Sequence, residues 1–412
     1  MPPVKRKTTT DANPKQMKLA PIFNQGGPKT KMGTWECMKN MWIYTSNDVK
    51  SQAKVASFDM DSTLITTASG RVFPKDPTDW KLLYDCIPKK LQDLAKDDFK
   101  LVIFTNQKGL EVGKVNPNEF KKKIESVVER MKVPMQVFIS LGHPTFRKPY
   151  VGMWDYFVGE SNDSLAIDFE NSIYVGDAAG RLVSSTRKKK DHSDADKLFA
   201  LNIKIKFATP EEFFLKQFTK ELFADIPFDP VNYLAQKMPK FVPADTQLGK
   251  DKQEMVILVG LPASGKSSLA QEWEAKHDYG VINRDTLGTQ EKCLKIANQM
   301  IEQGKSVVID NTNMDPASRK KYIDLAAKSN IPVRCFHLNL TLNHCMHNNA
   351  FRQIIGTDEA HHGINKMVIH RLQSSYKKPE LSENFESIVT VNFVPNFENE
   401  EHTKIYNYHL PY

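Results

Sequence analysis

The sequence contains few cysteines and no long apolar run. Its five cysteines among 412 residues are widely spaced and never form a Cys-x-x-Cys pair, so neither a disulfide framework nor a zinc module is indicated. No apolar stretch approaches the roughly 20 residues that would span a bilayer, and the first residues combine prolines and basic side chains without the apolar core of a secretory signal. These absences weigh against secretion and membrane anchoring, and they favour a reducing compartment, either cytosol or nucleus.

The chain also has little net charge outside its beginning. The whole sequence carries 57 Lys and Arg against 49 Asp and Glu, a formal charge of +8. Residues 1–34 contain seven basic residues and one acidic residue, which leaves a net charge of only +2 for residues 35–412. The same 34 residues hold scarcely any aliphatic side chains, so we expect them to form a disordered basic tail. The cluster at residues 5–7 is either a nuclear import signal or part of a solvated tail.

The remaining length is enough for two compact domains. Strand-like runs at residues 55–58, 101–104 and 172–175 alternate with helix-like segments such as residues 117–131. A second alternation begins at Met255, with helices expected from Lys266 and Pro316. This pattern predicts two α/β domains with doubly wound parallel sheets, at 35–218 and 253–412. Prolines interrupt residues 219–252, which we interpret as a linker or as an extended wrap around the domains.

The first cluster of chemically useful residues follows a buried strand. The run Val55-Ala-Ser-Phe-Asp59-Met-Asp61 ends in two carboxylates spaced two residues apart. Ligands of open α/β sheets bind beyond the carboxyl ends of the strands, so both carboxylates would face a site there. Paired acids repel each other unless a cation or a phosphate-handling task holds them together. A simple strand-terminating turn is the alternative reading of these two residues alone.

Three further segments favour a site that handles a cation or a phosphate over a simple turn. One strand ends in Thr105 and Asn106, whose hydroxyl and amide can donate to phosphate oxygens. Lys148 lies beside a proline and can neutralise a phosphoryl charge, and another strand ends in Asp177, an oxygen ligand suited to Mg²⁺. Each segment alone could be an ordinary core strand with its loop.

In this order the four segments resemble the haloacid dehalogenase superfamily of phosphotransferases. The resemblance implies that Asp59 attacks the phosphoryl group to form an aspartyl phosphate, while Asp61 protonates the leaving oxygen and then activates water. It also implies that Thr105 and Lys148 bind the phosphoryl oxygens. The implied Mg²⁺ ligands are Asp59, the backbone carbonyl of Asp61, and Asp177.

The second cluster is a glycine-rich loop between an expected strand and an expected helix. The pattern G-x-x-x-x-G-K-S is typical of a P-loop, whose backbone N–H groups cradle the phosphates of ATP while its lysine reaches the outer phosphates. Its serine is positioned to bind Mg²⁺, together with Asp310 at the end of the next strand, although Asp310 could also cap a helix. The candidate ATP-binding residues of the loop are Gly260, Leu261, Pro262, Ala263, Ser264, Gly265, Lys266 and Ser267.

Two residues indicate what would happen at this loop. Asp285 follows a short strand where P-loop kinases place the acceptor, and it could take the proton of an attacking hydroxyl; spacing alone equally allows it to cap a helix. Arg352 lies in a polar helix that resembles the lid of small kinases, where an arginine closes on the transferring phosphate. The alternative for that helix is a solvated face.

The sequence segments around and between the motifs are similar to those of the polynucleotide kinase 3′-phosphatase family. The matching runs include residues 100–107, 175–181, 187–191, 207–216, 283–288 and 309–313. The resemblance covers residues 35–412 and implies repair of DNA strand breaks: a 3′-phosphate is removed, and the γ-phosphate of ATP is moved to a 5′-hydroxyl, so that a ligase can seal the nick. Both reactions are expected to use Mg²⁺. An enzyme for RNA ends or small metabolites is the alternative, and an interaction protein with a vestigial fold is disfavoured by the intact acids and phosphate loop.

An enzyme that acts on ends needs backbone contacts rather than base readout. The candidate DNA-binding residues are Arg187, Lys188, Lys189, Lys190 and Arg284. A solvated charge run is the alternative for the first four. The family's work also implies a nuclear location, and nothing in the sequence suggests an oligomer, so we expect a monomer.

The sequence departs from relatives in three places. Ser62 stands where many haloacid dehalogenases have glycine, and Ala350 stands where related kinases have a lid arginine, so that only Arg352 remains. Vertebrate relatives carry an N-terminal forkhead-associated domain, whereas a short tail precedes the first domain here. We therefore do not expect phosphopeptide-dependent binding to a scaffold protein.

Overall fold

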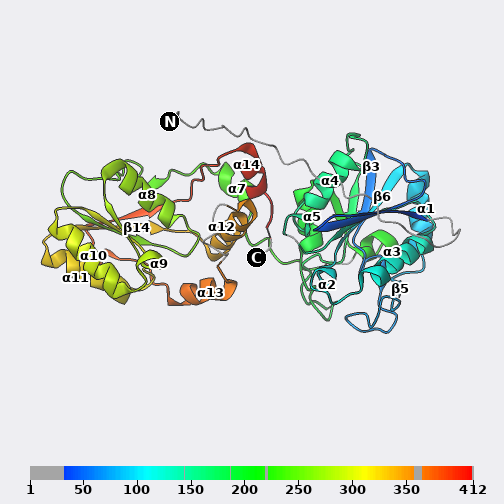
Figure 1. The fold of residues 1–412 in the computed structure, drawn as a ribbon, viewed down its shortest axis with the longest axis horizontal. Helices are drawn as coiled ribbons and strands as arrows, with labels where there is room; N and C mark the ends of the chain where they lie inside the picture. The colour runs from blue at the N-terminus through cyan, green and yellow to red at the C-terminus, as the bar shows by residue number, and fades with distance from the viewer. Residues whose placement is uncertain (1–31, 143, 186, 219–220, 357–363, 411–412) are drawn as a thin grey trace, which may run out of the picture.

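The computed structural model describes residues 32–142, 144–185, 187–218, 221–356 and 364–410. They form two α/β halves that lie side by side along the longest axis of the molecule (Figure 1). The expected disordered tail lies outside the described residues except for its last three positions. Strand β1 already begins at Gly33, two positions before the expected start of the first domain.

The first half is built on a seven-stranded sheet in the order β1-β2-β7-β6-β3-β8-β9. Its elements are β1 (Gly33–Cys37), β2 (Met41–Ser46), β3 (Lys54–Phe58), β4 (Ile65–Thr66), β5 (Lys81–Leu82), α1 (Ile87–Lys96), β6 (Phe99–Asn106), α2 (Lys108–Glu111), α3 (Pro117–Met131), β7 (Gln136–Ser140), η1 (Pro144–Phe146), α4 (Gly152–Glu160), β8 (Ile173–Val175), α5 (Ala195–Asn202), β9 (Lys206–Ala208) and α6 (Pro210–Leu215). The α/β fold expected from the sequence is confirmed, including the central strands and helix α3.

This sheet is mixed rather than purely parallel, which corrects the expectation. Strands β7, β6, β3, β8 and β9 are parallel, but β2 pairs antiparallel with both β1 and β7. The reason is the short connection from Cys37 to Met41, because a tight hairpin can only join antiparallel strands. The hairpin adds an edge and leaves the carboxyl ends of the parallel strands unchanged.

The second half is built on a six-stranded sheet in the order β10-β15-β14-β11-β13-β12. Five strands are parallel and β10 is antiparallel to β15. Its elements are α7 (Pro230–Ala235), β10 (Phe241–Val242), β11 (Met255–Val259), α8 (Lys266–His277), β12 (Gly280–Asn283), α9 (Arg284–Leu287), α10 (Gln290–Glu302), β13 (Val307–Asp310), α11 (Pro316–Lys328), β14 (Val333–Leu338), α12 (Leu342–Ile355), α13 (Lys366–Ser375), η2 (Leu381–Glu383), β15 (Ser387–Val391) and α14 (Glu400–Tyr406).

The proline-rich segment contacts both halves. At its start, the Leu182 N–H of the first half donates to the carbonyl of Leu222 at 2.7 Å, and its later residues lie against the second half. Its Phe228 ring stacks 4.2 Å from the ring of His344 in α12, and β10 extends the sheet of that half. Earlier aromatic residues, Phe213 and Phe214, belong to the core of the first half. Of the two readings of this segment, the extended wrap describes its contacts better than a free linker.

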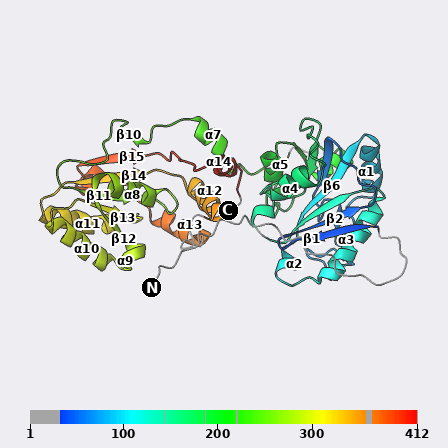
Figure 2. The same ribbon diagram turned by 45° about the horizontal axis from the view of Figure 1, so that its top comes forward.

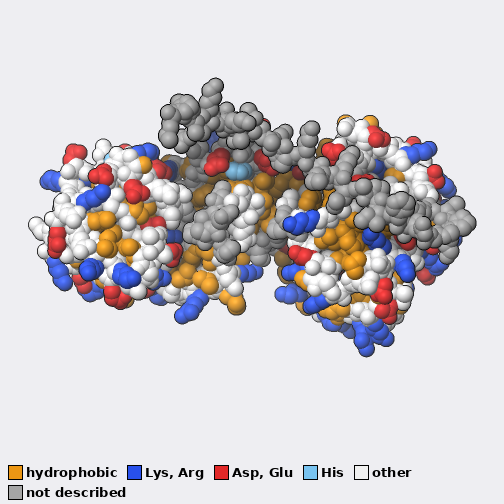
Figure 3. Space-filling model, viewed as in Figure 1, with side chains coloured by type: hydrophobic (Ala, Val, Ile, Leu, Met, Phe, Trp, Pro, Cys, Tyr) orange, Lys and Arg blue, Asp and Glu red, His pale blue; other side chains and the backbone are white. Residues whose placement is uncertain are grey.

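Charged side chains of both signs are distributed over the surface. On the face drawn in Figure 3, Lys and Arg side chains alternate with Asp and Glu side chains over both halves, in keeping with the small net charge of residues 35–412. In the described part of the chain, no helix combines the length and the apolar character that crossing a membrane requires.

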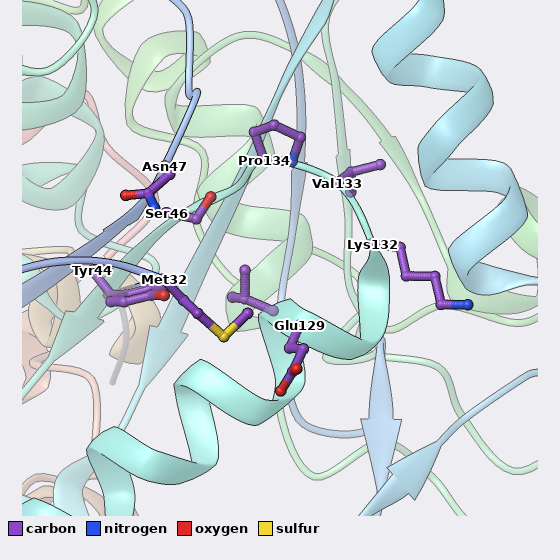
Figure 4. A pocket seen from close by; sticks show the side chains of 9 residues that line it. Met32, Tyr44, Ser46, Asn47, Glu129, Lys132, Val133 and Pro134 are labelled. Carbon is purple, nitrogen blue, oxygen red and sulfur yellow. The ribbon is translucent and has the colours of Figure 1, made fainter. Parts of the chain in front are cut away.

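One hollow of the first half lies away from the sheet edge where ligands bind. It measures about 290 Å³ and is lined by Tyr44 and Ser46 of β2, by Glu129 of α3 and by the loop 132–134 (Figure 4). Since β7 begins directly after this loop, the hollow lies at the amino end of the parallel strands. The functional residues described below lie at the opposite edge.

Candidate active sites

The first site forms where β3 and β8 end beside each other. Asp59 follows β3, and its backbone N–H donates to the carbonyl of Val175 at 2.9 Å, which joins the two strand ends. The Lys148 ammonium lies 2.6 Å from Asp59 Oδ1. The side chain of Lys148 is only 2% exposed, so the structure brings these two expected residues together in a nearly dry environment.

Three carboxylates surround this lysine. Asp59, Asp177 and Asp196 offer oxygen atoms that all lie within 4.8 Å of one another. Asp196 Oδ1 accepts hydrogen bonds from Lys148 Nζ at 2.7 Å and from the Tyr174 hydroxyl at 2.9 Å. Asp196 was not among the candidate residues, and the carboxylate of Asp61, whose expected metal ligand is the backbone carbonyl, lies outside this group.

The electrostatics of the cluster favour a divalent cation. Burial raises the pKa of Asp59 to about 7, with Lys148 opposing and Asp196 adding to the rise. Burial and the charges of Asp59 and Asp196 raise the pKa of Asp177 to about 8. Burial alone would lower the pKa of Lys148, but the carboxylates of Asp196 and Asp59 outweigh it and raise this pKa. Three acids facing one ammonium leave an excess of negative charge that an oxygen-seeking ion such as Mg²⁺ would balance.

Asp61 lies at the mouth of this site. Its carboxylate accepts hydrogen bonds from Gln107 Nε2 at 2.7 Å and from Lys123 Nζ at 3.3 Å, and its side chain is 52% exposed. Gln107 also donates to Thr105 Oγ1 at 2.9 Å. Thr105 and Asp61 are therefore joined through Gln107, a residue that sequence reasoning missed, and Asp61 remains open to water as a proton carrier must.

Asn106 is used to hold Lys148. Its Oδ1 accepts from the Lys148 backbone N–H at 2.9 Å, and its Nδ2 donates to the Lys148 carbonyl at 3.2 Å. This two-way pairing fixes the lysine backbone across 42 residues of sequence. The sequence suggested that the Asn106 amide donates to phosphate oxygens. In the structure this amide instead positions the backbone of Lys148.

The turn that follows Asp61 carries the strain expected from its serine. Ser62 has φ of 62°, in the left-handed region that glycine adopts most easily. Its N–H donates to the carbonyl of Ile65 at 2.7 Å, which closes the turn. The turn therefore keeps its shape without glycine.

The second site is the loop between β11 and α8. Gly260 must be glycine, because a Cβ there would lie 2.9 Å from Ser264 Oγ and 3.0 Å from Leu338 Cβ. Ala263 and Gly265 both adopt positive φ, of 60° and 96°. Lys266 begins α8, so the loop N–H groups and the helix amino terminus share one anion-binding site.

Charged residues of three other elements lie within electrostatic range of Lys266. Burial lowers the pKa of its ammonium to about 8, opposed by the charges of Asp310 and Asp285, while the charge of Arg352 lowers it further. The ammonium donates to the carbonyl of Leu261 at 2.7 Å. The structure therefore gathers three of the expected kinase residues around the lysine.

Neither Asp285 nor Asp310 is the capping residue of a helix, so helix capping does not explain either acid. The cap of α9 is Asn283, whose side chain accepts from the N–H of Asp285. The cap of α11 is Asp315, while Asp310 is the last residue of β13 and accepts from Asn283 Nδ2 at 2.8 Å. Exposed Ser267 in the first turn of α8 completes the magnesium ligands proposed for this site.

The basic run after Asp177 divides into two kinds of residue. Arg187 is only 20% exposed and makes ion pairs with Glu221 at 3.0 Å, and with Asp191 and Glu211 at 3.4 Å. Arg181 shares the last two acids. Arg187 is thus part of a structural network, and its expected role in DNA binding stays a prediction. The next three lysines, at 188–190, and Arg284 are exposed.

Together, the two sheet edges carry the residues of a phosphatase with a carboxylate nucleophile and of a P-loop kinase. Family models agree: residues 54–214 match "Polynucleotide kinase 3 phosphatase" and residues 255–379 match "AAA domain". The chain is 38% identical, over 87% of its length and 84% of the relative, to the "Bifunctional polynucleotide phosphatase/kinase" of Schizosaccharomyces pombe. It belongs to the family of bifunctional polynucleotide phosphatase/kinases.

Two further relatives match either both halves or one. A protein of Acanthamoeba polyphaga mimivirus, named "Putative bifunctional polynucleotide phosphatase/kinase", is 31% identical over 82% of this chain and 85% of its own length. The "Polynucleotide 3'-phosphatase ZDP" of Arabidopsis thaliana is 38% identical over 45% of this chain and 27% of its own length.

Proposed function

We propose that this chain restores ligatable DNA ends by removing a 3′-phosphate and by transferring the γ-phosphate of ATP to a 5′-hydroxyl. The observation that carries the proposal is the coexistence, in a chain of this family, of two complete and separate phosphoryl-transfer sites. One is the acidic cluster around Lys148, and the other is the loop that ends in Lys266. A nick with a 3′-phosphate and a 5′-hydroxyl needs both reactions.

In the phosphatase site, each residue has a defined task. An Asp59 oxygen attacks phosphorus and forms an acyl phosphate while the bond to the 3′ oxygen breaks. Asp61, in its acid form, gives a proton to that leaving oxygen, and then takes a proton from the water that hydrolyses the acyl phosphate. Lys148 neutralises the phosphoryl oxygens, and Thr105 donates its hydroxyl hydrogen bond to them.

In the kinase site, Lys266 and the loop N–H groups bind the ATP phosphates, and Arg352 approaches the transferring group. Asp285 takes the proton of the 5′-hydroxyl as that oxygen attacks the γ-phosphorus and ADP leaves. Asp59 and Asp177, with the carbonyl of Asp61, would hold Mg²⁺ in one half, and Ser267 and Asp310 in the other. When bound, Mg²⁺ supplies positive charge to the phosphoryl oxygens at both sites.

Binding of DNA would use the exposed lysines at 188–190 and Arg284, which contact phosphates without reading bases. We place the protein in the nucleus, supported by the basic cluster at residues 5–7, and we propose that it works as a monomer.

The decisive assay uses a nicked duplex with 3′-phosphate and 5′-hydroxyl termini in the presence of Mg²⁺ and ATP. Matched RNA duplexes and mononucleotides serve as competing substrates. We expect both ends of the DNA nick to be converted. Turnover of the mononucleotides or the RNA alone would contradict the proposal and support the alternative enzyme for RNA ends or metabolites.

A further inference from the structure

The C-terminal segment, residues 393–410, lies between the two halves. Figures 1 and 2 both show α14 beside α7 and α12 and near the first half. Tyr406, at the end of α14, is fully buried in the second half. Tyr408, two residues later, packs against the core of the first half. The segment therefore contacts both domains.

Tyr406 is held by one face of α12. Its hydroxyl lies 2.9 Å from His344 Nε2 and donates to Asn348 Oδ1 at 3.0 Å. Its carbonyl lies 2.9 Å from His347 Nε2. His347 and Asn348 lie three and four residues after His344, so all three partners point to the same side of the helix. Because the hydroxyl has a single proton and gives it to Asn348, His344 must donate through Nε2–H.

Asn348 also contacts the phosphate-binding loop, so it connects Tyr406 with that loop. Its Nδ2 donates to the carbonyl of Ala263 at 3.0 Å. The amide can do so only with its nitrogen towards Ala263 and its oxygen towards Tyr406, since the reverse orientation would place two oxygens against each other. The Ala263 carbonyl, which can only accept, therefore fixes which way the Asn348 amide points, and the Tyr406 hydroxyl holds the amide oxygen at the other end.

The contact falls on a strained residue of the loop. Ala263 has φ of 60°, which a residue with a Cβ adopts only when its surroundings hold it there. The Phe393 ring lies beside the neighbouring turn: a Cβ on Gly265 would lie 3.8 Å from it, and this ring stacks 5.9 Å from that of Tyr406. The C-terminal segment thus reaches the loop through Asn348 and lies next to it at Phe393.

We propose that Tyr406 and Asn348 are positioning residues of the kinase. Tyr406 anchors the oxygen of the Asn348 amide, and the amide nitrogen holds the Ala263 carbonyl so that the N–H groups of the loop stay directed at the phosphates of ATP. This rests on the kinase activity proposed above and adds a control on the loop by residues far away in the sequence.

The same segment is tied to the phosphatase half at its other end. Asn202 of α5 pairs with the His409 backbone, accepting from its N–H at 2.8 Å and donating to its carbonyl at 3.1 Å. Asn202 also donates to the carbonyl of Pro149, the residue after Lys148, at 2.9 Å. A continuous series of contacts therefore runs from the kinase loop to the backbone that carries the phosphatase lysine.

Tyr406→Phe is the sharpest test, because it removes one hydroxyl and keeps the ring. We expect the KM for ATP to rise about five-fold, the factor that the loss of one buried hydrogen bond represents. The KM for the 5′-hydroxyl end and the 3′-phosphatase rate should stay at their wild-type values. Lys404→Ala removes an exposed ion pair to Asp155 on the same segment and serves as the matched control, with no change in any of these constants.

A double-mutant cycle separates positioning from general damage. Asn348→Ala should raise the KM for ATP at least as much as Tyr406→Phe, and the double variant should be no worse than Asn348→Ala, because both act through one contact. An unchanged KM for ATP in Tyr406→Phe, fully additive effects, or an equal loss of both enzymatic activities would overturn the proposal.

Direct calorimetry of ATP binding keeps this test apart from the proposed function. A Kd for ATP that rises about five-fold in Tyr406→Phe would support positioning even if no polynucleotide end were phosphorylated. A wild-type protein that binds ATP but phosphorylates no end would instead refute the proposed substrate. A variant that binds ATP as tightly as the wild type would refute the positioning role.

Discussion

The Lys148 ammonium lies 2.7 Å from Asp196 Oδ1, and both side chains are almost completely buried. Asp196 also accepts from the N–H of Ala178 at 3.0 Å, directly after the metal-ligand candidate Asp177. It therefore holds the lysine and the end of β8 in place at once. Its contacts suggest that it orients the groups that meet the phosphoryl oxygens.

Replacing Asp196 by Asn keeps the size of the side chain and removes its charge. Lys148 retains Asp59 as a partner, so we expect the fold to persist with a loss of about 2 kcal/mol in unfolding free energy, less than for a fully broken buried pair. The phosphatase kcat should fall about ten- to a hundred-fold, as is usual when a supporting group of a metal site is lost. The kinase rate in the same preparation is the internal control, and exposed Asp163→Asn is the matched variant. A wild-type phosphatase rate would show that Asp196 has no part in the reaction.

Asp196 also shows what the sequence could and could not predict. Asp59 and Asp177 come just after strands and Lys148 lies beside a proline, so all three were found from local pattern, whereas Asp196 lies inside a helix with no motif around it. A signal was nevertheless present: Asp196 shares its helix face with Phe199 and Ala200, so an acid stands on an apolar face. Such a residue needs a buried partner, but only the fold shows that the partner is Lys148.

In the kinase half, too, local patterns were predictable, whereas a contact between residues far apart in the sequence was not. The P-loop and the first residues of α8 and α11 followed from glycines, prolines and apolar runs. The contact of Tyr406 with Asn348 joins residues 58 positions apart, and neither stands in a pattern that indicates function. Hydrogen bonds of this kind depend on how helices pack, which periodicity does not determine.

The two activities should be separable by single substitutions. Asp59→Asn removes the nucleophile and should lower 3′-dephosphorylation by more than about a thousand-fold while leaving 5′ phosphorylation intact. Lys266→Ala should lower 5′ phosphorylation by more than about a hundred-fold and spare the phosphatase. Both reactions are measured on one nicked duplex labelled at each end. Loss of both activities in either variant, with the fold verified by circular dichroism, would contradict the two-site arrangement.

Mg²⁺ should stabilise the phosphatase half in the absence of ATP. The three clustered acids carry more negative charge than Lys148 neutralises, so an ion that binds the folded state adds stability, about 2.7 kcal/mol at a hundred times its Kd. Melting curves with Mg²⁺ and with a chelator should therefore differ by several degrees. The difference should disappear in Asp177→Asn. An equal gain in this variant would place the ion elsewhere.

Acid should destabilise the kinase half through its buried histidines. Burial lowers the pKa of His337 to about 4, of His344 to about 3 and of His347 to about 4. Below the ordinary histidine pKa the unfolded chain binds protons that the folded chain does not, so stability is complete above about pH 6.5 and falls as the pH decreases. The loss approaches about 1.4 kcal/mol per histidine and pH unit.

Urea unfolding at pH 7.5 and 5.5, followed by hydrogen exchange in α12, measures this effect. His347→Gln should reduce the dependence on pH, whereas exposed His370→Gln should not. A stability of α12 that is the same at both pH values would show that these histidines gain protons in the folded protein at the same pH as in the unfolded chain.

The basic run at 187–190 should divide into a structural residue and DNA contacts. Replacing the exposed lysines Lys188, Lys189 and Lys190 with alanine should weaken binding to any duplex and reduce the slope of log K against log salt by up to about 3, since each phosphate contact contributes roughly 0.9. Arg187→Ala breaks ion pairs to Asp191, Glu211 and Glu221, so it should lower the melting temperature and leave the salt slope unchanged. Fluorescence anisotropy with a short nicked duplex at several salt concentrations measures both. If Arg187→Ala changed the slope while the triple lysine variant did not, Arg187 would be the residue that contacts phosphate, and the exposed lysines would be a solvated surface.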